Sequence, residues 1–161
     1  MTQILPIEGW AAVYDEVDLN GDIIAPGAFR SSLARSGAPA VKLLYQHAAE
    51  QPVGRWLRFE ERPTGLYARG ELYLATQTAR EVAELVQARI IDGLSIGYRT
   101  LRAHKADGAR RIVEAELWEV SIVTFPMAPK ARLVRAGVED AADDVIAFAD
   151  SVRKAARILT A

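Results

Sequence analysis

Residues 117–126 read LWEVSIVTFP, a mostly apolar run that closes on a proline. β-Branched and aromatic side chains are typical of strands, and a proline interrupts strand pairing. Asp107-Gly108 lies upstream, between an arm that begins with LSIGYRTLRA at Leu94 and a return arm from Arg111 to Phe125. Asp-Gly between two such runs is a hairpin signal. The sequence therefore predicts a long β-hairpin with its tip at residues 107–108.

More strands are expected in the first half of the chain. One runs from Ile4 to Tyr14, and a short buried one runs from Val41 to Tyr45. A second hairpin pairs residues 54–60 with residues 66–74, because Pro63-Thr64-Gly65 between them is typical of a turn.

Two helices separate these strands. Pro26 and Gly37 suit the start and the end of a short helix. Thr78 followed by Glu81 fits a capping box for a second helix that ends near Ile91. Its apolar residues form one stripe at helical spacing: Val82, Leu85, Val86 and Ile90. Many strands with few helices favour an α+β or barrel-like domain.

Composition excludes several classes of protein. The 161 residues suffice for one domain with a core, and a net charge of −1 lacks the basic surface of a nucleic-acid-binding domain. The apolar runs fall short of the about 20 residues that a membrane span requires. The N-terminus lacks the basic and apolar regions of a signal peptide, so we expect a cytoplasmic protein. Because there is no cysteine, disulfides, thiolate catalysis and cysteine-bound zinc are excluded.

The sequence DLNGD at residues 18–22 alternates like the start of a calcium-binding loop. In an EF-hand the sixth position is glycine and the twelfth is glutamate, but these positions hold Ile23 and Phe29. Asn20-Gly21 instead favours a tight turn. We therefore expect neither a metal site nor a cofactor.

The composition changes after Gly137. Residues 138–144 are acidic, and apolar residues then recur at roughly helical spacing up to residue 159. We therefore divide the chain into a domain of residues 1–137 and a C-terminal helical tail of residues 138–161. The tail is interpreted as a docking, scaffold-like or removable segment.

Ser95 is the candidate nucleophile. A serine hydroxyl needs a neighbouring base, and the flanking Gly93 and Gly97 let a substrate carbonyl and backbone N–H donors approach closely. GLSIG matches the spacing of the α/β-hydrolase nucleophile elbow, in which a strand leads into the serine and a helix follows. Here a helix precedes the serine and a strand follows it, so that fold is disfavoured.

The chain has two histidines that could act as the base. His104 lies beside the predicted turn at residues 107–108, so we expect it to be exposed. His47 ends the predicted strand 41–45, where a histidine is commonly a hydrogen-bonded structural residue. A serine flanked by glycines elsewhere in the chain favours a catalytic role for His47.

A carboxylate should orient the imidazole, and the return arm offers Glu114, Glu116 and Glu119. Glu119 has apolar neighbours on both faces of its strand, where an unpaired charge is costly. Its partner is either His47 or an arginine. Glu116 is nearer the hairpin tip and is expected to face solvent.

Several short motifs, in this order, resemble the prohead proteases of tailed phages, which are distant relatives of the herpesvirus assembly proteases. They cover most of the chain, from about residue 7 to residue 135: GWA at 9–11, D-x-x-GD at 18–22, PGAF at 26–29, LYQH at 44–47, GLSIGY at 93–98 and LWEVSIVTFP at 117–126. One departure is Met127-Ala128, where relatives often have alanine followed by asparagine; this affects the exit of the strand more than the chemistry.

The resemblance implies a closed, mostly antiparallel β-barrel surrounded by helices. It also implies a serine nucleophile at Ser95, a base at His47 and, as in the phage branch, a carboxylate at Glu119. The expected reaction is peptide hydrolysis through an acyl-enzyme, with oxyanion donors near Ser95 or in the loop after Pro126. His104 lies outside the motifs and receives no role.

The resemblance further implies a serine endopeptidase that acts inside an assembling procapsid in the host cytoplasm. Its substrates would be the major capsid protein, its scaffold segment and, given the change in composition after Gly137, its own tail. The herpesvirus relatives suggest a homodimer, whereas no nucleic acid or membrane partner is expected. Two rival interpretations remain: a catalytically silent assembly or scaffold-binding module of the same fold, and a hydrolase of small esters.

Overall fold

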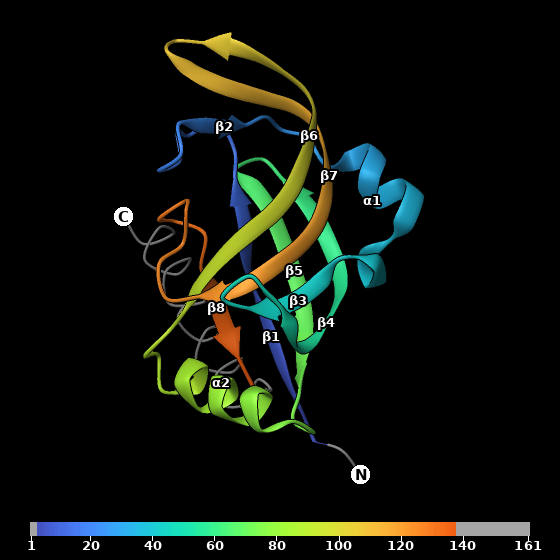
Figure 1. Ribbon diagram of the computed structural model, residues 1–161, viewed down its shortest axis with the longest axis vertical. Coiled ribbons are helices and arrows are strands. Elements are labelled where there is room, and N and C mark those ends of the chain that lie inside the picture. The colour runs from blue at the N-terminus through green and yellow to red at the C-terminus, as the bar shows by residue number, and fades with distance from the viewer. Residues whose placement is uncertain (1–2, 138–161) are drawn as a thin grey trace, which may run out of the picture.

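The computed structural model describes residues 3–137, which form one eight-stranded sheet with helices at its margins (Figure 1). The strands are β1 (Ile4–Val13), β2 (Asp22–Ile24), β3 (Lys42–Tyr45), β4 (Ala48–Arg62), β5 (Gly65–Tyr73), β6 (Gly93–Ala106), β7 (Ala109–Val123) and β8 (Leu133–Ala136). The helices are α1 (Arg30–Ser36), the 3₁₀ helix η1 (Ala38–Ala40) and α2 (Gln77–Gln87). The mostly-β class expected from the sequence is confirmed.

The hairpin of β6 and β7 is the longest feature of the sheet. It turns at Asp107-Gly108 as predicted, crosses the front of the molecule and projects beyond it at the top of Figure 1. The sheet order is β2-β7-β3-β4-β5-β1-β8, and β6 pairs with the other edge of β7. β7 therefore has β6 on one side and both β2 and β3 on the other.

The strand pairing is mostly antiparallel, as expected, but the expectation of a closed barrel is wrong. β2 and β3 run parallel to β7, and the strand order does not return to its start within residues 3–137. At the gap, β8 and β6 are linked by an isolated bridge between Gly93 and Arg132 rather than by a ladder. Pro126 and Pro129 lie in the connection between β7 and β8, where proline cannot donate to a ladder. The sheet is strongly curved but open.

The core lies between the concave face of this sheet and α2. Its largest fully buried side chains come from β3 to β7 and from the residue before α1: Trp56, Phe29, Leu43, Leu66, Leu72, Leu94, Ile112 and Ile122. Helix α2 covers one end with Ala79, Val82, Ala83 and Val86.

The start of α2 differs from the expected capping box. The Thr76 hydroxyl, not that of Thr78, caps the helix by accepting the Ala79 N–H at 3.1 Å. Because the helix already ends at Gln87, Ile90 lies outside the apolar stripe and is 68% exposed.

The turn at residues 18–22 is held by its own hydrogen bonds. The Asp18 carboxylate accepts the N–H groups of Asn20 and Asp22 at 2.8 and 2.9 Å. Within residues 3–137 no cluster of acidic and histidine side chains is suited to bind a metal ion.

Asp22 fastens the projecting hairpin to β2. Its buried carboxylate accepts two hydrogen bonds from the Arg110 guanidinium, at 2.8 and 2.7 Å, and one from the Tyr98 hydroxyl at 2.9 Å. The hydrogen bonds from Arg110 are the main cause of a lowered Asp22 pKa, which burial opposes. Burial, with the bond to Asp22, raises the pKa of Tyr98. These contacts fix the far half of β6 and β7.

The tail expected at residues 138–161 lies outside the described residues, so the domain boundary at 137 stays a prediction. No helix within residues 3–137 has the length and apolar character needed to cross a bilayer.

Replacing Leu72 by alanine should lower the free energy of unfolding by about 2–5 kcal/mol, because the side chain is fully buried in the hydrophobic core. The same change at Leu57, which is 52% exposed on β4, should cost less than about 0.5 kcal/mol. Urea unfolding with a common m-value measures the difference. Equal midpoints for the two variants would contradict this description of the core.

Candidate active site

His47 lies in the two-residue turn between β3 and β4. Tyr45 pairs with Ala48, and both central residues have positive φ angles, 54° for Gln46 and 59° for His47. This is the pattern of a type I′ turn, which normally contains asparagine and glycine. For other residues the left-handed conformation costs roughly 1–2 kcal/mol each. Surrounding contacts must therefore hold the turn.

Those contacts come from the end of β7. The Gln46 N–H donates to the Ile122 carbonyl at 2.9 Å. The Gln46 side-chain amide donates to the Thr124 hydroxyl at 2.7 Å and accepts the Thr124 N–H at 3.3 Å. The His47 N–H donates to the Ser121 hydroxyl at 3.1 Å. β7 thus holds the turn through residues 121–124.

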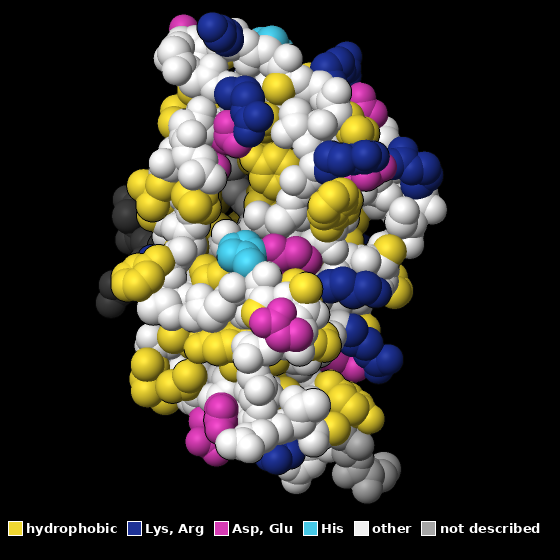
Figure 2. Space-filling model, viewed as in Figure 1, with side chains coloured by type: hydrophobic (Ala, Val, Ile, Leu, Met, Phe, Trp, Pro, Cys, Tyr) yellow, Lys and Arg dark blue, Asp and Glu magenta, His cyan; other side chains and the backbone are white. Residues whose placement is uncertain are grey.

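The imidazole of His47 contacts the carboxylate of Glu119, with Nδ1 and Oε1 2.5 Å apart. A carboxylate accepts, so Nδ1–H donates and Nε2 of the neutral ring stays available as an acceptor. The other oxygen, Oε2, accepts the Ser121 hydroxyl at 2.6 Å. Figure 2 shows a histidine in contact with an acidic side chain near the middle of the displayed face, bordered by hydrophobic side chains. Of the two partners left open for Glu119, the structure has the histidine.

This contact raises the pKa of His47 above its ordinary value of 6.5. The hydrogen bond that His47 donates to Glu119 is the main cause of the raised pKa, burial of the ring opposes it, and the negative charge of Glu119 adds to it. The pair stabilises the folded chain fully below pH 6.5, where the imidazole is protonated in both folded and unfolded states. That contribution is lost as the pH rises through the raised pKa.

Ser95 points to the same face of the hairpin. In the register of β6 and β7, Ser95 lies opposite Ser121 and Gly97 lies opposite Glu119. A Cβ on Gly97 would fall 2.3 Å from Oε1 of Glu119, so this face of β6 is the one that meets the carboxylate. Ser95, two residues earlier, shares that face. Directly opposite residues have Cβ atoms about 4.5–5.5 Å apart, so Ser95 adjoins the cluster of His47, Glu119 and Ser121.

The Ser95 hydroxyl has no hydrogen-bond partner among residues 3–137, and this includes His47. The residue is only 5% exposed, yet no fully buried side-chain oxygen or nitrogen in the described part of the chain lacks a partner. The hydroxyl must therefore retain a small accessible surface. It adjoins a cavity of about 40 Å³ lined also by Ala11, Leu94, Met127 and Ala128. Catalytic hydrogen bonds in serine enzymes are often long when no substrate is bound. A Ser95 hydroxyl without a hydrogen bond to His47 is therefore compatible with a role as nucleophile.

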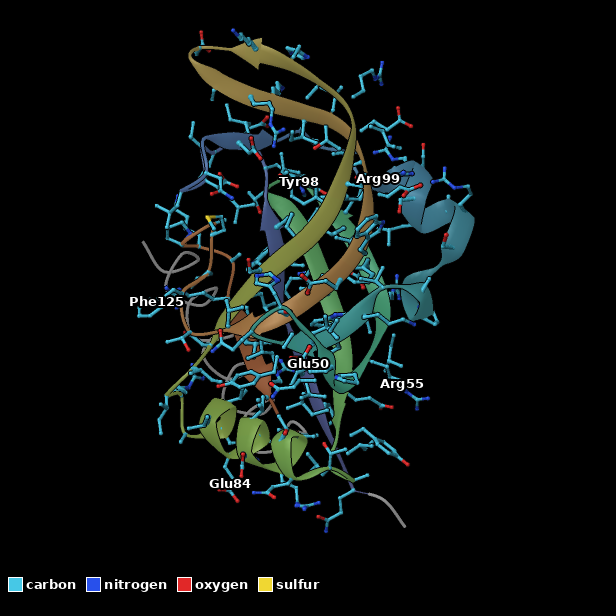
Figure 3. The ribbon with its side chains drawn as sticks, viewed as in Figure 1. Glu50, Arg55, Glu84, Tyr98, Arg99 and Phe125 are labelled. Carbon is cyan, nitrogen blue, oxygen red and sulfur yellow. The ribbon has the colours of Figure 1, made fainter. Side chains whose placement is uncertain are left out.

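Exposed apolar side chains border the loop after β7. Phe125 is 87% exposed and lies at the left margin of the molecule in Figure 3. Met127 accepts the N–H of Leu19 through its carbonyl at 3.0 Å, and Leu19 itself is 73% exposed. Because Met127 also lines the cavity at Ser95, this apolar rim is continuous with the candidate site.

The remaining candidates lie elsewhere. His104 is exposed near the hairpin tip, as expected. Glu114 pairs with Arg102, and Glu116 pairs with Arg35 and Arg99. The structure therefore brings together Ser95, His47 and Glu119 and leaves the other candidates apart.

Sequence reasoning missed the contributions of Ser121 and Gly97. The alternation of a strand places Ser121 on the face of Glu119, which was a usable signal. The close approach of Gly97 to Glu119 depends on strand register, for which the sequence held no signal. A β-bulge at Trp118 shifts that register, because Tyr98 pairs with Leu117 and Gly97 with Glu119.

A serine beside a histidine–carboxylate pair is the arrangement of a serine hydrolase, and comparison with known families agrees with it. A sequence profile described as caudovirus prohead serine protease matches residues 1–143. The chain belongs to this family. The family expected from the sequence motifs is confirmed. Among curated proteins, the prohead protease of Enterobacteria phage HK97 is 32% identical over 127 residues. The match covers 77% of this chain and 56% of that protein, so the chain spans little more than half of its length.

Solved structures share the fold of this prohead protease family member. The bacteriophage T4 capsid assembly protease gp21 superposes with a TM-score of 0.58 over 75% of this chain and 82% of that one, at 16% identity. The KSHV protease bound to a hexapeptide phosphonate inhibitor gives 0.56 over 85% and 66%, also at 16% identity. The varicella-zoster virus protease gives 0.55 over 85% and 65%, at 13% identity. At these identities the likeness establishes the fold alone.

Replacing Glu119 by glutamine should lower the pKa of His47 toward 6.5, because the main group that raises it is removed. NMR titration of the His47 imidazole in wild type and variant measures the change. An unchanged His47 pKa in the Glu119→Gln variant would contradict the contact.

Replacing Gly97 by alanine should have a similar effect without touching a charged group, since the added methyl takes the place of Oε1 of Glu119. The matched variant is Gly108→Ala, at the hairpin tip, where a Cβ meets no atom within 4 Å. Gly108→Ala should cost only about 1 kcal/mol of backbone strain and should not change the pKa of His47. If both variants titrate like the wild type, Gly97 is not needed for the carboxylate's position.

Proposed function

We propose that this chain is a serine endopeptidase that processes capsid and scaffold proteins during phage head maturation, with Ser95, His47 and Glu119 as its catalytic triad. The observation that carries the proposal is the contact between His47 and Glu119 on the face of the β6–β7 hairpin to which Ser95 points. Membership of the prohead serine protease family supports it.

The proposed mechanism is acyl transfer. Nε2 of His47 accepts the proton of the Ser95 hydroxyl as its oxygen attacks a peptide carbonyl. The protonated imidazole, held at Nδ1 by Glu119, then gives the proton to the leaving amine. A water molecule attacks the acyl-enzyme by the same steps and releases the second product. A small rotation of the imidazole or the serine would complete the hydrogen bond between them.

Backbone N–H groups are the candidate oxyanion donors. The loop at residues 126–131 borders the cavity beside Ser95 through Met127 and Ala128. N–H groups on this wall or next to Ser95 would face a developing oxyanion. The exposed apolar rim of Leu19, Phe125 and Met127 would contact the substrate on either side of the cleaved bond.

The proposed substrates are the major capsid protein and its scaffold segment, cleaved inside the assembling procapsid in the host cytoplasm. The name of the HK97 relative, a prohead protease, supports this place of action. Cleavage of its own tail, within or before residues 138–161, and assembly as a homodimer are part of the proposal. Mass spectrometry of mature particles checks the former, since an intact tail would count against it.

Co-expression with the major capsid protein tests the function. Wild type should generate one new capsid N-terminus, and Ser95→Ala should reduce the rate by roughly 10³-fold or more, as loss of a serine nucleophile does elsewhere. Ser32→Ala is the control, because Ser32 is buried like Ser95 but lies in α1, where its hydroxyl accepts the Leu117 N–H. Normal capsid processing with Ser95→Ala would favour the silent assembly module. Turnover of small esters without capsid cleavage would favour the ester hydrolase.

The rate should also depend on pH in a defined direction. The base must be neutral to accept a proton, so kcat/KM should rise with pH, with its midpoint above 6.5 because Glu119 raises the pKa of His47. Glu119→Gln should move this midpoint down and reduce the rate at the plateau. A rate that does not change between pH 5 and 8 would exclude His47 as the base.

A further inference from the structure

Ser121 connects two parts of the candidate site with one hydroxyl group. It accepts the His47 N–H at 3.1 Å and donates to Oε2 of Glu119 at 2.6 Å. The residue has no exposed surface, and its position on β7 is fixed by pairing with β6 on one side and β3 on the other. The hydroxyl is therefore a rigid reference point, not a mobile surface group.

The first of these contacts holds the backbone of His47. The base lies in a turn whose two central residues are in the left-handed region, and neither is glycine or asparagine. Three other hydrogen bonds hold the neighbouring Gln46, but the bond to Ser121 is the one made by the His47 backbone itself. Without it, the N–H of His47 would lose its acceptor and the ring would lose its nearest backbone anchor.

The second contact holds the carboxylate. Glu119 has two oxygens, and each has one partner: His47 at Oε1 and Ser121 at Oε2. Because Gly97 leaves no side chain at this place, the carboxylate is not confined there by packing against a neighbouring Cβ. Its orientation toward the imidazole therefore depends on the hydrogen bond from Ser121.

We propose that Ser121 is a positioning residue of the site. Its hydroxyl holds the imidazole of His47 and the carboxylate of Glu119 in place beside Ser95. Its meaning for catalysis rests on the proposed function, but the geometric claim does not. Ser121 itself lies directly opposite Ser95 across β6 and β7, so one strand position aligns all three groups. It takes no part in bond making.

A direct test measures the imidazole in a chain that cannot cleave itself. In a Ser95→Ala background, the pKa of His47 is compared by NMR with that in Ser95→Ala/Ser121→Ala. The second variant should show a lower His47 pKa, because the carboxylate is no longer held against the ring. Ser95→Ala/Ser32→Ala, which removes another buried serine bonded to the β7 backbone, should show the same His47 pKa as Ser95→Ala.

A pair of larger variants separates the hydroxyl from its volume. Ser121→Thr keeps the hydroxyl and Ser121→Val does not, while both add the same bulk to a fully buried position. In enzyme with Ser95 intact, Ser121→Ala and Ser121→Val should lower kcat about 10- to 100-fold with KM changed less than about 2-fold. Ser121→Thr should recover most of the lost kcat relative to Ser121→Val.

The outcomes separate the two proposals. An unchanged His47 pKa in Ser95→Ala/Ser121→Ala, or equal kcat for the Thr and Val variants of Ser121, would overturn the positioning role. So would a loss of thermal stability in Ser121→Ala equal to that in Ser32→Ala with no change in kcat. A wild-type chain without peptidase activity would refute the proposed function, while the NMR comparison would still decide the role of Ser121.

Discussion

The parallel pairing of β3 with β7 is the constraint on which the site depends. It sets Lys42 opposite Glu119 and Tyr45 opposite Ile122, so the turn that follows β3 falls beside residues 121–124. The other edge of β7 pairs with β6 and places Ser95 opposite Ser121. One strand thus aligns groups from three distant parts of the chain, and a slip of one residue on either side would turn a member of the site to the wrong face.

Local signals explain why most elements could be predicted. The Asp107-Gly108 tip, the hairpin around residues 63–65 and the strand ending at Tyr45 follow from turn residues and apolar runs. Whether the sheet closes into a barrel could not be predicted from such local signals, because closure depends on which distant strands pair. Here β6 and β8 share only an isolated bridge between Gly93 and Arg132, so the sheet stays open.

The candidate site, too, could be predicted only in part. Residue chemistry indicated Ser95 and His47 and left the partner of Glu119 open between His47 and an arginine. The family resemblance implied all three residues together. No local signal predicted the Gln46-His47 turn, because neither residue is the asparagine or glycine typical of such a turn. Tertiary contacts from Ser121 and Thr124 override the local preference there. A conformation that is unfavourable locally and held by distant contacts is common at functional sites.

The central claim is that His47 activates the hydroxyl of Ser95, and covalent labelling tests it most directly. An alkyl fluorophosphonate reacts with activated serines, and peptide mapping by mass spectrometry identifies the modified residue. We expect a single adduct on Ser95 that is lost when His47 is replaced by alanine and kept when His104 is replaced by alanine. An adduct on another serine, or labelling of Ser95 that persists without His47, would contradict it.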